Sequence, residues 1–259
     1  MAGSNQHITD FLAKEGIVAF RDQLRDARAH AINDAEGYQE LLFALERLGS
    51  MLVKKIGTLG DYGGNVLKMA SLSPLAKEIP KKHTEFHSSS PHLYELIMTA
   101  RNDALHQGAF ARHLAAHAIQ LEIVLEDALM SDAITVCDFM VRNPVCAEVW
   151  QPISFIRQQM LSNSFSYLPV LRDAKWHLLS DQSLAQYLRV NSEVRKQRLA
   201  LTLDEAIVQN GLTPISAQCS NAEDEVSHVM PSFQGHPILV TRRENQQDLI
   251  GILTAFDLL

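Results

Sequence analysis

The sequence predicts an α + α/β protein, with an all-helical N-terminal half over residues 1–130 and an α/β C-terminal half over residues 131–259. Three observations predict this division. Apolar residues in the first half recur at three- and four-residue spacings, which is the period of an amphipathic helix. No convincing strand pattern appears before residue 130. After that point, short β-like runs alternate with short helical runs, and the pattern occurs twice.

The helices of the first half are expected from spacing and capping. Residues 38–56 carry one apolar stripe, which the glycines between Gly57 and Gly64 should end. A second helix should begin at Ser90-Pro91, because serine caps a helix N-terminus and proline suits its first turn. A third helix closes this half. The apolar positions of the three helices are Leu41, Leu42, Leu45, Leu48, Leu52 and Ile56; Leu93, Leu96 and Ile97; and Phe110, Leu114, Ala118, Leu121, Leu125 and Leu129.

The second half contains two similar units, residues 131–190 and 199–259, joined by a helical linker over residues 191–199. Each unit has about 60 residues, which is small for an independent core, so the pair should pack as one domain. The matched segments are Thr135–Met140 with Thr202–Ile207, Pro144-Val145 with Pro214-Ile215, Leu168–Leu171 with His236–Leu239, and Leu178–Ser180 with Ile252–Thr254.

Composition and charge exclude several classes of protein. The chain carries 23 Lys plus Arg against 30 Asp plus Glu, and 46% of its residues are hydrophobic, which is typical of a globular protein. No apolar run approaches the roughly 18 residues of a membrane span, and the N-terminus lacks a secretory signal pattern. The three cysteines form no framework, which favours reduced thiols in the cytoplasm. Neither half has a basic arm, so no DNA binding is expected and any RNA contact must be local.

Two segments of the second half resemble the motifs of tandem CBS domains. They are Pro169-Val170-Leu171 and the closing run Gly251-Ile252-Leu253-Thr254-Ala255-Phe256-Asp257. The closing pattern is a glycine, two apolar residues, a threonine and, three residues later, an aspartate. The resemblance covers nearly all of residues 131–259. It implies two β-α-β-β-α units packed as one pseudo-symmetric module that forms homodimers and whose clefts often bind adenosine derivatives.

The residue types explain how such a cleft can bind a nucleotide. An aspartate at a helix start can accept both ribose hydroxyls, and a threonine three residues earlier can bond the ribose or a phosphate. By the resemblance, Thr254 and Asp257 hold the ribose and phosphate of an adenine nucleotide (AMP, ADP or ATP). Thr135 and Met140 then flank the base, and His236 faces the phosphates.

The first unit departs from this pattern. His177 stands in place of the glycine and Ser183 in place of the aspartate, so at most one good nucleotide site is expected. The alternative is a module that binds no nucleotide and serves as a dimerisation surface, with Asp257 simply capping the last helix.

The first half contains the run Arg101-Asn102-Asp103-Ala104-Leu105-His106, which resembles the motif of HEPN domains. The looser similarity spans residues 35–130. HEPN domains are helical bundles, usually homodimeric, and many are endoribonucleases that need no metal or other cofactor. In such a reaction His106 would carry the proton, Arg101 would stabilise charge on the phosphoryl oxygens, and Asn102 would orient the site.

The spacing of this motif leaves alternatives open. Five positions on a regular helix rotate a side chain by roughly 140°. Either the helix therefore starts or kinks within the motif, or a second copy of the chain completes the site. Without catalysis, Arg101 could pair with Glu95 or Asp103 while His106 fills an interface. His106, His113 and His117 have a spacing that could bind zinc, although their apolar neighbours favour a packed interface.

Together, the two resemblances predict a nucleotide-regulated, metal-independent endoribonuclease in a bacterial stress or phage-defence response. In this hypothesis the CBS pair senses an adenine nucleotide and controls a dimeric HEPN-type active site, with no membrane partner. The alternative is a non-catalytic adenine-nucleotide sensor or adaptor whose helical domain binds a partner protein.

Overall fold

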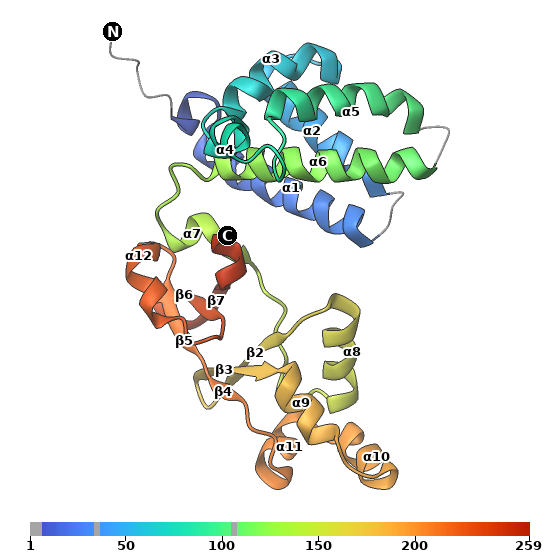
Figure 1. Cartoon of the computed structure of the whole chain (residues 1–259). Helices are drawn as coiled ribbons and strands as arrows, with labels where there is room; N and C mark the ends of the chain where they lie inside the picture. Colours follow the sequence, from blue (N-terminus) through green and yellow to red (C-terminus); the bar gives the residue numbers. More distant parts are fainter. Residues whose placement is uncertain (1–6, 34–36, 105–107) are drawn as a thin grey trace. The chain divides into compact units, whose positions relative to one another are not determined.

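The computed structural model describes residues 7–33, 37–104 and 108–259, with the side chains of 102–104, 108–111 and 210 outside that description. The chain divides into two compact units, Met1–Ala133 and Ile134–Leu259 (Figure 1). The first is helical and the second is α/β, so the expected fold class is confirmed. In the part of the chain that the structure describes, no helix is long and apolar enough to cross a membrane.

The helical unit is built around its last helix, α6, which packs against α1, α2, α3 and α5. The leucine stripe of α2 faces this core, where Leu41, Leu45 and Leu48 are completely buried. The elements of this unit are η1 (Ile8–Asp10), α1 (Lys14–Asn33), α2 (Tyr38–Val53), α3 (Leu59–Ala70), η3 (Pro74–Ala76), α4 (Glu78–Lys82), α5 (Ser90–Ala104) and α6 (Gly108–Leu129).

Three glycines that were expected to end a helix, Gly60, Gly63 and Gly64, lie inside helix α3. Helix α2 ends at Val53, before any of these glycines, and Ile56 lies beyond the helix with 91% of its surface exposed. Gly63 lies within α3, where an added Cβ would lie 3.0 Å from Cε1 of Tyr94 on α5. Glycine therefore serves close helix packing here, and this packing outweighs its low helix propensity.

Helices α1 and α6 share a buried charged cluster. Glu126 of α6 accepts hydrogen bonds from Arg25 and Arg28 of α1, the latter at 2.7 Å. One turn earlier on α6, Glu122 is completely buried, and neither carboxyl oxygen has a hydrogen-bond partner in the described structure. Burial raises the pKa of Glu122 to about 9, with Arg28 opposing the shift and Glu126 adding to it. Glu122 is therefore protonated at neutral pH.

The α/β unit contains two repeats joined by α10 (Ser192–Ala200). The first repeat comprises α7 (Val136–Phe139), β1 (Val141–Arg142), α8 (Ile153–Asn163), β2 (Tyr167–Arg172), β3 (Lys175–Ser180) and α9 (Asp181–Leu188). The second comprises α11 (Leu203–Asn210), β4 (Ile215–Ser216), β5 (Gln218–Asn221), α12 (Val226–Val229), η4 (Met230–Ser232), β6 (Ile238–Arg242), β7 (Asn245–Leu253) and η5 (Ala255–Leu258).

Each repeat contributes its first strand to the sheet of the other. Within the described residues, one sheet has the order β1-β7-β6-β5 and the other has the order β2-β3-β4. Strand β1 of the first repeat pairs antiparallel with β7 of the second, and β4 of the second repeat pairs antiparallel with β3 of the first. Two separate hydrophobic cores fill the repeats. Because of the exchange, neither sheet is complete without the other repeat.

Strand register shifts two of the matches made from the sequence. Val141 pairs with Ile252 and Ile215 pairs with Leu178, so the counterpart of Ile215 is Val141 and not Val145. The difference arises because α11 has eight residues whereas α7 has four.

The alignment of Pro169 with Pro237 is likewise shifted from the structural correspondence of the two repeats. Leu168 pairs with Leu179 and Ile238 pairs with Leu253, one residue before each following helix cap. Leu168 therefore corresponds to Ile238, and not to His236. Both counterparts are buried in their cores. Pro169 lies inside the edge strand β2, where a missing N–H is tolerated.

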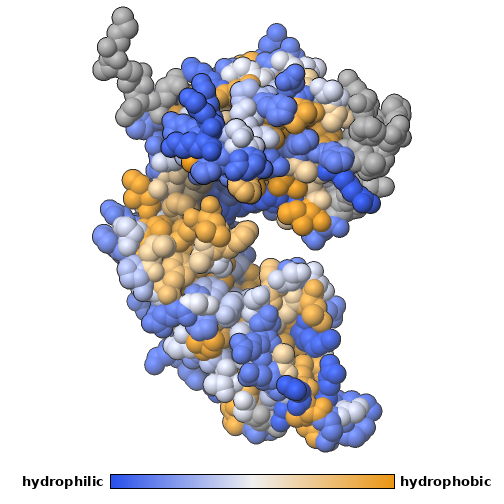
Figure 2. Space-filling model, in the orientation of Figure 1, coloured by the Kyte–Doolittle hydropathy of each residue, from blue (hydrophilic) through white to orange (hydrophobic). Residues whose placement is uncertain are grey.

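Exposed apolar side chains gather at one end of the α/β unit. The area around α12 and η5 is apolar on the visible face (Figure 2). Met230 directly follows α12, Phe256 lies in η5 and Leu259 directly follows η5, and these side chains are 50%, 71% and 99% exposed.

The protonated state of Glu122 predicts a specific pH dependence of stability. Between about pH 4.5 and about pH 9, Glu122 of the folded chain keeps a proton that Glu122 of the unfolded chain has already released. This one group therefore lowers the free energy of unfolding by about 1.4 kcal/mol per pH unit as pH rises through that window. Urea denaturation of Glu122→Gln should show a weaker decline between about pH 6 and about pH 8.5 than the parent chain. Asp127→Asn, an exposed change on the same helix, should keep the parental slope; identical slopes in parent and Glu122→Gln would contradict a buried neutral carboxyl.

Candidate functional site

A cavity of about 340 Å³ lies where the two repeats of the α/β unit meet, and we call it the inter-repeat cavity. The start of the first repeat, the approach to β2 and the end of β7 supply its walls. Apolar side chains dominate them. The lining residues are Val141, Asn143, Pro144, Val145, Ser164, Phe165, Ser166, Tyr167, Pro169, Pro237, Ile252 and Thr254. Its volume is within the range of about 300–1,000 Å³ that is typical of small-molecule sites.

The turn after β7 brings Thr254 to this cavity. Both the backbone N–H and the hydroxyl of Thr254 donate to Oδ2 of Asp257, at 2.7 and 2.8 Å. Asp257 is 6% exposed. This is a capping box, in which an N-cap threonine and the residue three positions later satisfy each other's hydrogen bonds. The capping role considered for Asp257 is therefore present, and it fixes Thr254 at the wall of the cavity.

The first repeat opens with the same arrangement. The backbone N–H and hydroxyl of Thr135 donate to Oδ2 of Asp138, at 2.9 and 2.8 Å, and Asp138 is 7% exposed. The N–H groups of Val136 and Cys137 donate to backbone carbonyls of the second repeat. In the described structure, this capping box anchors α7 to the second repeat and does not line the inter-repeat cavity.

Met140 and His236 lie near the cavity without being among its described lining residues. Met140 is buried against Gly251, where an added Cβ would lie 2.4 Å from its sulfur. Nδ1 of His236 lies 3.1 Å from the hydroxyl of Tyr167, and the two rings meet edge to face. Of the ligand residues expected from the sequence, the structure thus places Thr254 in the wall, Asp257 behind it, and His236 behind Tyr167.

The sequence reasoning missed most of the cavity wall. Phe165 comes from the chain leading into β2 and Tyr167 is the first residue of β2, whereas Asn143 comes from a turn where its φ of 51° is left-handed. The Asn143-Pro144 pair is a turn signal that pointed to this bend. The two aromatic residues had no such signal, because an aromatic side chain near a strand is far more often part of a core.

The first repeat has no carboxylate at the position that corresponds to Asp257. Ser180 caps α9 by accepting from the N–H of Ser183 at 3.0 Å, and the hydroxyl of Ser183 donates to the backbone carbonyl of Ser180 at 2.9 Å. The Thr–Asp pair of the second repeat is thus a Ser–Ser pair here, and the position of Asp257 holds no anionic acceptor in the first repeat, where the nearest carboxylate is Asp181 at the start of α9.

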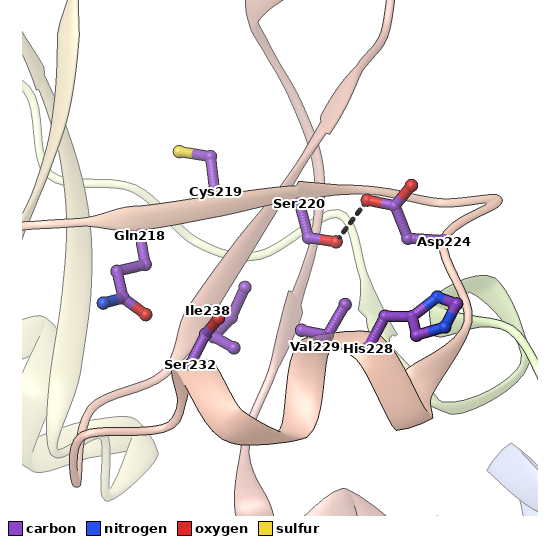
Figure 3. Close-up of a pocket in the computed structure, with 8 residues that line it drawn as sticks. All are labelled: Gln218, Cys219, Ser220, Asp224, His228, Val229, Ser232 and Ile238. Carbon is purple, nitrogen blue, oxygen red and sulfur yellow. Dashed lines mark hydrogen bonds between the residues drawn. The ribbon is translucent and has the colours of Figure 1, made fainter.

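A second cavity, of about 430 Å³, lies between β5 and α12 (Figure 3). Gln218 and Ser220 point from β5 toward the helix, whereas Cys219 points to the other side of the strand (Figure 3). The hydroxyl of Ser220 donates to Asp224 at 2.8 Å. The N–H of Asn221, followed by that hydroxyl, lowers the pKa of Asp224. This cavity is open where α12, with four residues, covers less of the sheet than α8 with eleven.

The Arg101 motif lies at the end of helix α5. The helix ends at Ala104 and α6 begins at Gly108, so the described part of the motif is helical and its last two residues, Leu105 and His106, lie outside the described residues. Arg101 is 38% exposed, and its Nη2 lies 2.9 Å from Oε1 of Glu46 on α2. Its described partner is therefore Glu46 and not Glu95, whereas the side chain of Asp103 lies outside the described residues. His106 and the side chain of Asn102 lie outside the described residues.

Histidines on α6 do not form a described metal centre. In residues 7–33, 37–104 and 108–259, no three His, Cys, Asp or Glu side chains are grouped so that they could hold a metal ion. Nδ1 of His117 is buried without a hydrogen-bond partner in the described structure. Burial, then the nearby His113 and His92, lower the pKa of His117, which favours its neutral form.

Solved structures similar to this chain are CBS domain pairs that match its C-terminal half. No family model and no curated protein matches the chain. A CBS domain-containing protein of unknown function from Bacillus anthracis str. Ames Ancestor is similar, with 17% identity over 48% of this chain and 89% of that one, at a TM-score of 0.40. A putative acetoin utilization protein (AcuB) from Vibrio cholerae has 17% identity over 48% and 87%, at a TM-score of 0.38. CBSX2 in complex with AMP has 17% identity over 48% and 91%, at a TM-score of 0.35.

The close contact between Gly251 and Met140 predicts that Met140→Ala relieves part of the destabilisation caused by Gly251→Ala. Gly251→Ala places a methyl group against the sulfur of Met140 and should destabilise the α/β unit by about 1–3 kcal/mol, as overpacking does. Met140→Ala should also destabilise, but the double variant should lose less than the sum of the two changes, because the shortened side chain makes room. Thermal unfolding of the four proteins measures this coupling. Strict additivity would show that Met140 does not pack against Gly251.

Proposed function

We propose that the α/β unit is a sensor that binds an adenosine-based ligand in the inter-repeat cavity. The observation that carries this proposal is the capping box of Thr254 and Asp257 at the wall of a largely apolar cavity that both repeats build. Such a cavity combines the two surfaces that a nucleoside needs. Apolar walls suit a flat base, and oxygen acceptors suit the hydroxyls of a ribose.

The cavity itself supports the ligand class. Val141 and Val145 enter from the first repeat and Ile252 from the second, so a base bound among them would contact both repeats. The backbone N–H and the hydroxyl of Thr254 both donate to Asp257. The hydroxyl oxygen of Thr254 still has lone pairs that can accept a hydrogen bond from a sugar hydroxyl. The similar CBSX2 structure holds AMP. The assignment to this chain rests on its own residues.

A ligand between the repeats can act as a regulator by shifting the population of conformations. If the arrangement of the repeats differs between two states, the ligand favours the state in which both walls fit it. We propose that the chain acts as a homodimer and that this shift is transmitted to the helical unit.

A second proposed function is RNA cleavage by the helical unit, which would make the chain a ligand-regulated endoribonuclease. The observation that favours it is Arg101, which is held by Glu46 at the end of α5 while its side chain stays partly exposed. A guanidinium fixed in this way can bind a phosphate and stabilise charge on it. In the scheme His106 moves the proton and Asn102 orients the site, without a metal. If the helical unit is not catalytic, the remaining proposal is an adaptor that binds a partner protein.

The sensor proposal predicts that binding depends on Thr254. By isothermal titration, adenosine or an adenine nucleotide should bind the full chain, and Thr254→Ala should weaken binding about tenfold, which corresponds to about 1.4 kcal/mol. Thr202→Ala is the matched control, because Thr202 forms the same kind of capping box with Glu205 outside the cavity. It should change the affinity less than about twofold. Equal losses in both variants, or no binding by the parent chain, would refute the proposed site.

The endoribonuclease proposal predicts chelator-resistant cleavage of RNA that depends on Arg101. Arg101→Ala should lower the cleavage rate by about 100-fold or more, since it removes a cation from the site where charge develops. Arg47→Ala, an exposed change on α2, should keep the parental rate. An absence of cleavage by the parent dimer, with and without adenosine or ATP, would favour the adaptor.

A further inference from the structure

We infer that the inter-repeat cavity selects an adenine nucleoside whose 5′ substituent is uncharged and discriminates against its phosphorylated forms. This inference rests on the proposed sensor function and narrows its ligand. The carrying observation is electrostatic: among the described residues that line the cavity, none is Lys, Arg, His, Asp or Glu.

The arginine between two lining residues has a partner outside the described lining of the cavity. Val141 and Asn143 line the cavity, whereas Arg142 is not among its described lining residues. The guanidinium of Arg142 donates to the sulfur of Cys137 at 3.3 Å, and Cys137 is not a described lining residue either. The cation nearest to this wall along the chain is thus hydrogen-bonded to another residue.

The polar end of the cavity favours ligand groups that donate hydrogen bonds over ligand groups that only accept them. Thr254 gives both its backbone N–H and its hydroxyl proton to Asp257, so neither is left for a phosphate oxygen. The carboxylate of Asp257 lies directly behind, where it repels an anion and attracts hydroxyl donors. A ribose supplies such donors, whereas a phosphate supplies only acceptors.

The remaining polar groups are neutral. The hydroxyl of Tyr167 contacts Nδ1 of His236 and the backbone carbonyl of Gly235, so its single proton has a partner within the protein. Ser164, Ser166 and Asn143 can hydrogen-bond a small neutral substituent. They cannot neutralise a phosphate, and burying an unpaired charge costs far more than one hydrogen bond returns.

The affinity series that tests this inference uses the full chain and three ligands with the same base and sugar. Isothermal titration should give a dissociation constant for adenosine that is at least about tenfold lower than that for AMP, with ATP weaker again. Adenosine binding should also change little between low and high salt, because no ion pair forms. AMP or ATP binding as tightly as adenosine, or more tightly, would overturn the inference and leave the sensor function standing. Binding by none of the three would overturn both.

A charge introduced at the rim provides the reciprocal test. Ser166 lines the cavity and is exposed, so Ser166→Lys should place an ammonium beside a bound ligand. We expect AMP affinity to rise about tenfold while adenosine affinity, which also reports intact folding, stays within about twofold. Gln218→Lys adds the same charge at the other cavity, on β5, and should leave both affinities unchanged. Equal gains from the two lysines would show a general charge effect and would contradict the assignment to this cavity.

Discussion

The exchange of first strands between the two repeats is the constraint on which the α/β unit depends. β1 of the first repeat pairs with β7 of the second, and β4 of the second repeat pairs with β3 of the first. Backbone hydrogen bonds therefore join segments that are far apart in the sequence. The inter-repeat cavity is a direct result. Its walls come from residues beside β1 and from the end of β7. A ligand there would touch the same strands that hold the repeats together.

The unequal repeats explain why the cavities of this unit differ. The second repeat keeps the Thr254–Asp257 capping box beside a largely apolar cavity, whereas the first has Ser180 and Ser183 at the matching positions and therefore no carboxylate in place of Asp257. Loss of an anionic acceptor removes a means of holding ribose hydroxyls, although the serine pair still caps its helix. Capping the helix and binding a ribose are thus separable roles at this turn, because a helix cap requires only a hydrogen-bond acceptor.

The sequence predicted the fold class and the order of elements better than it predicted the site. Apolar periodicity specified α2 and the two-fold repeat, since both patterns are local. Strand register was missed because it depends on which strand lies opposite. The equivalence of Leu168 and Ile238 in the two repeats appears only when the pairing of each residue with its neighbouring strand is known. The role of Gly63 in α3 was missed for a similar reason, since its close approach to Tyr94 on another helix is not visible in the local sequence. Thr254 was found from its motif, and Tyr167 was not.

The central claim is that one adenosine-sized ligand contacts both repeats at the inter-repeat cavity. Hydrogen–deuterium exchange of the full chain with and without adenosine tests it most directly, because exchange reports each segment separately. A ligand in this cavity should add protection at the start of the first repeat, around Val141–Val145, and at the same time in the turn that contains Thr254. Protection confined to β5 and α12, around the other cavity, would contradict it.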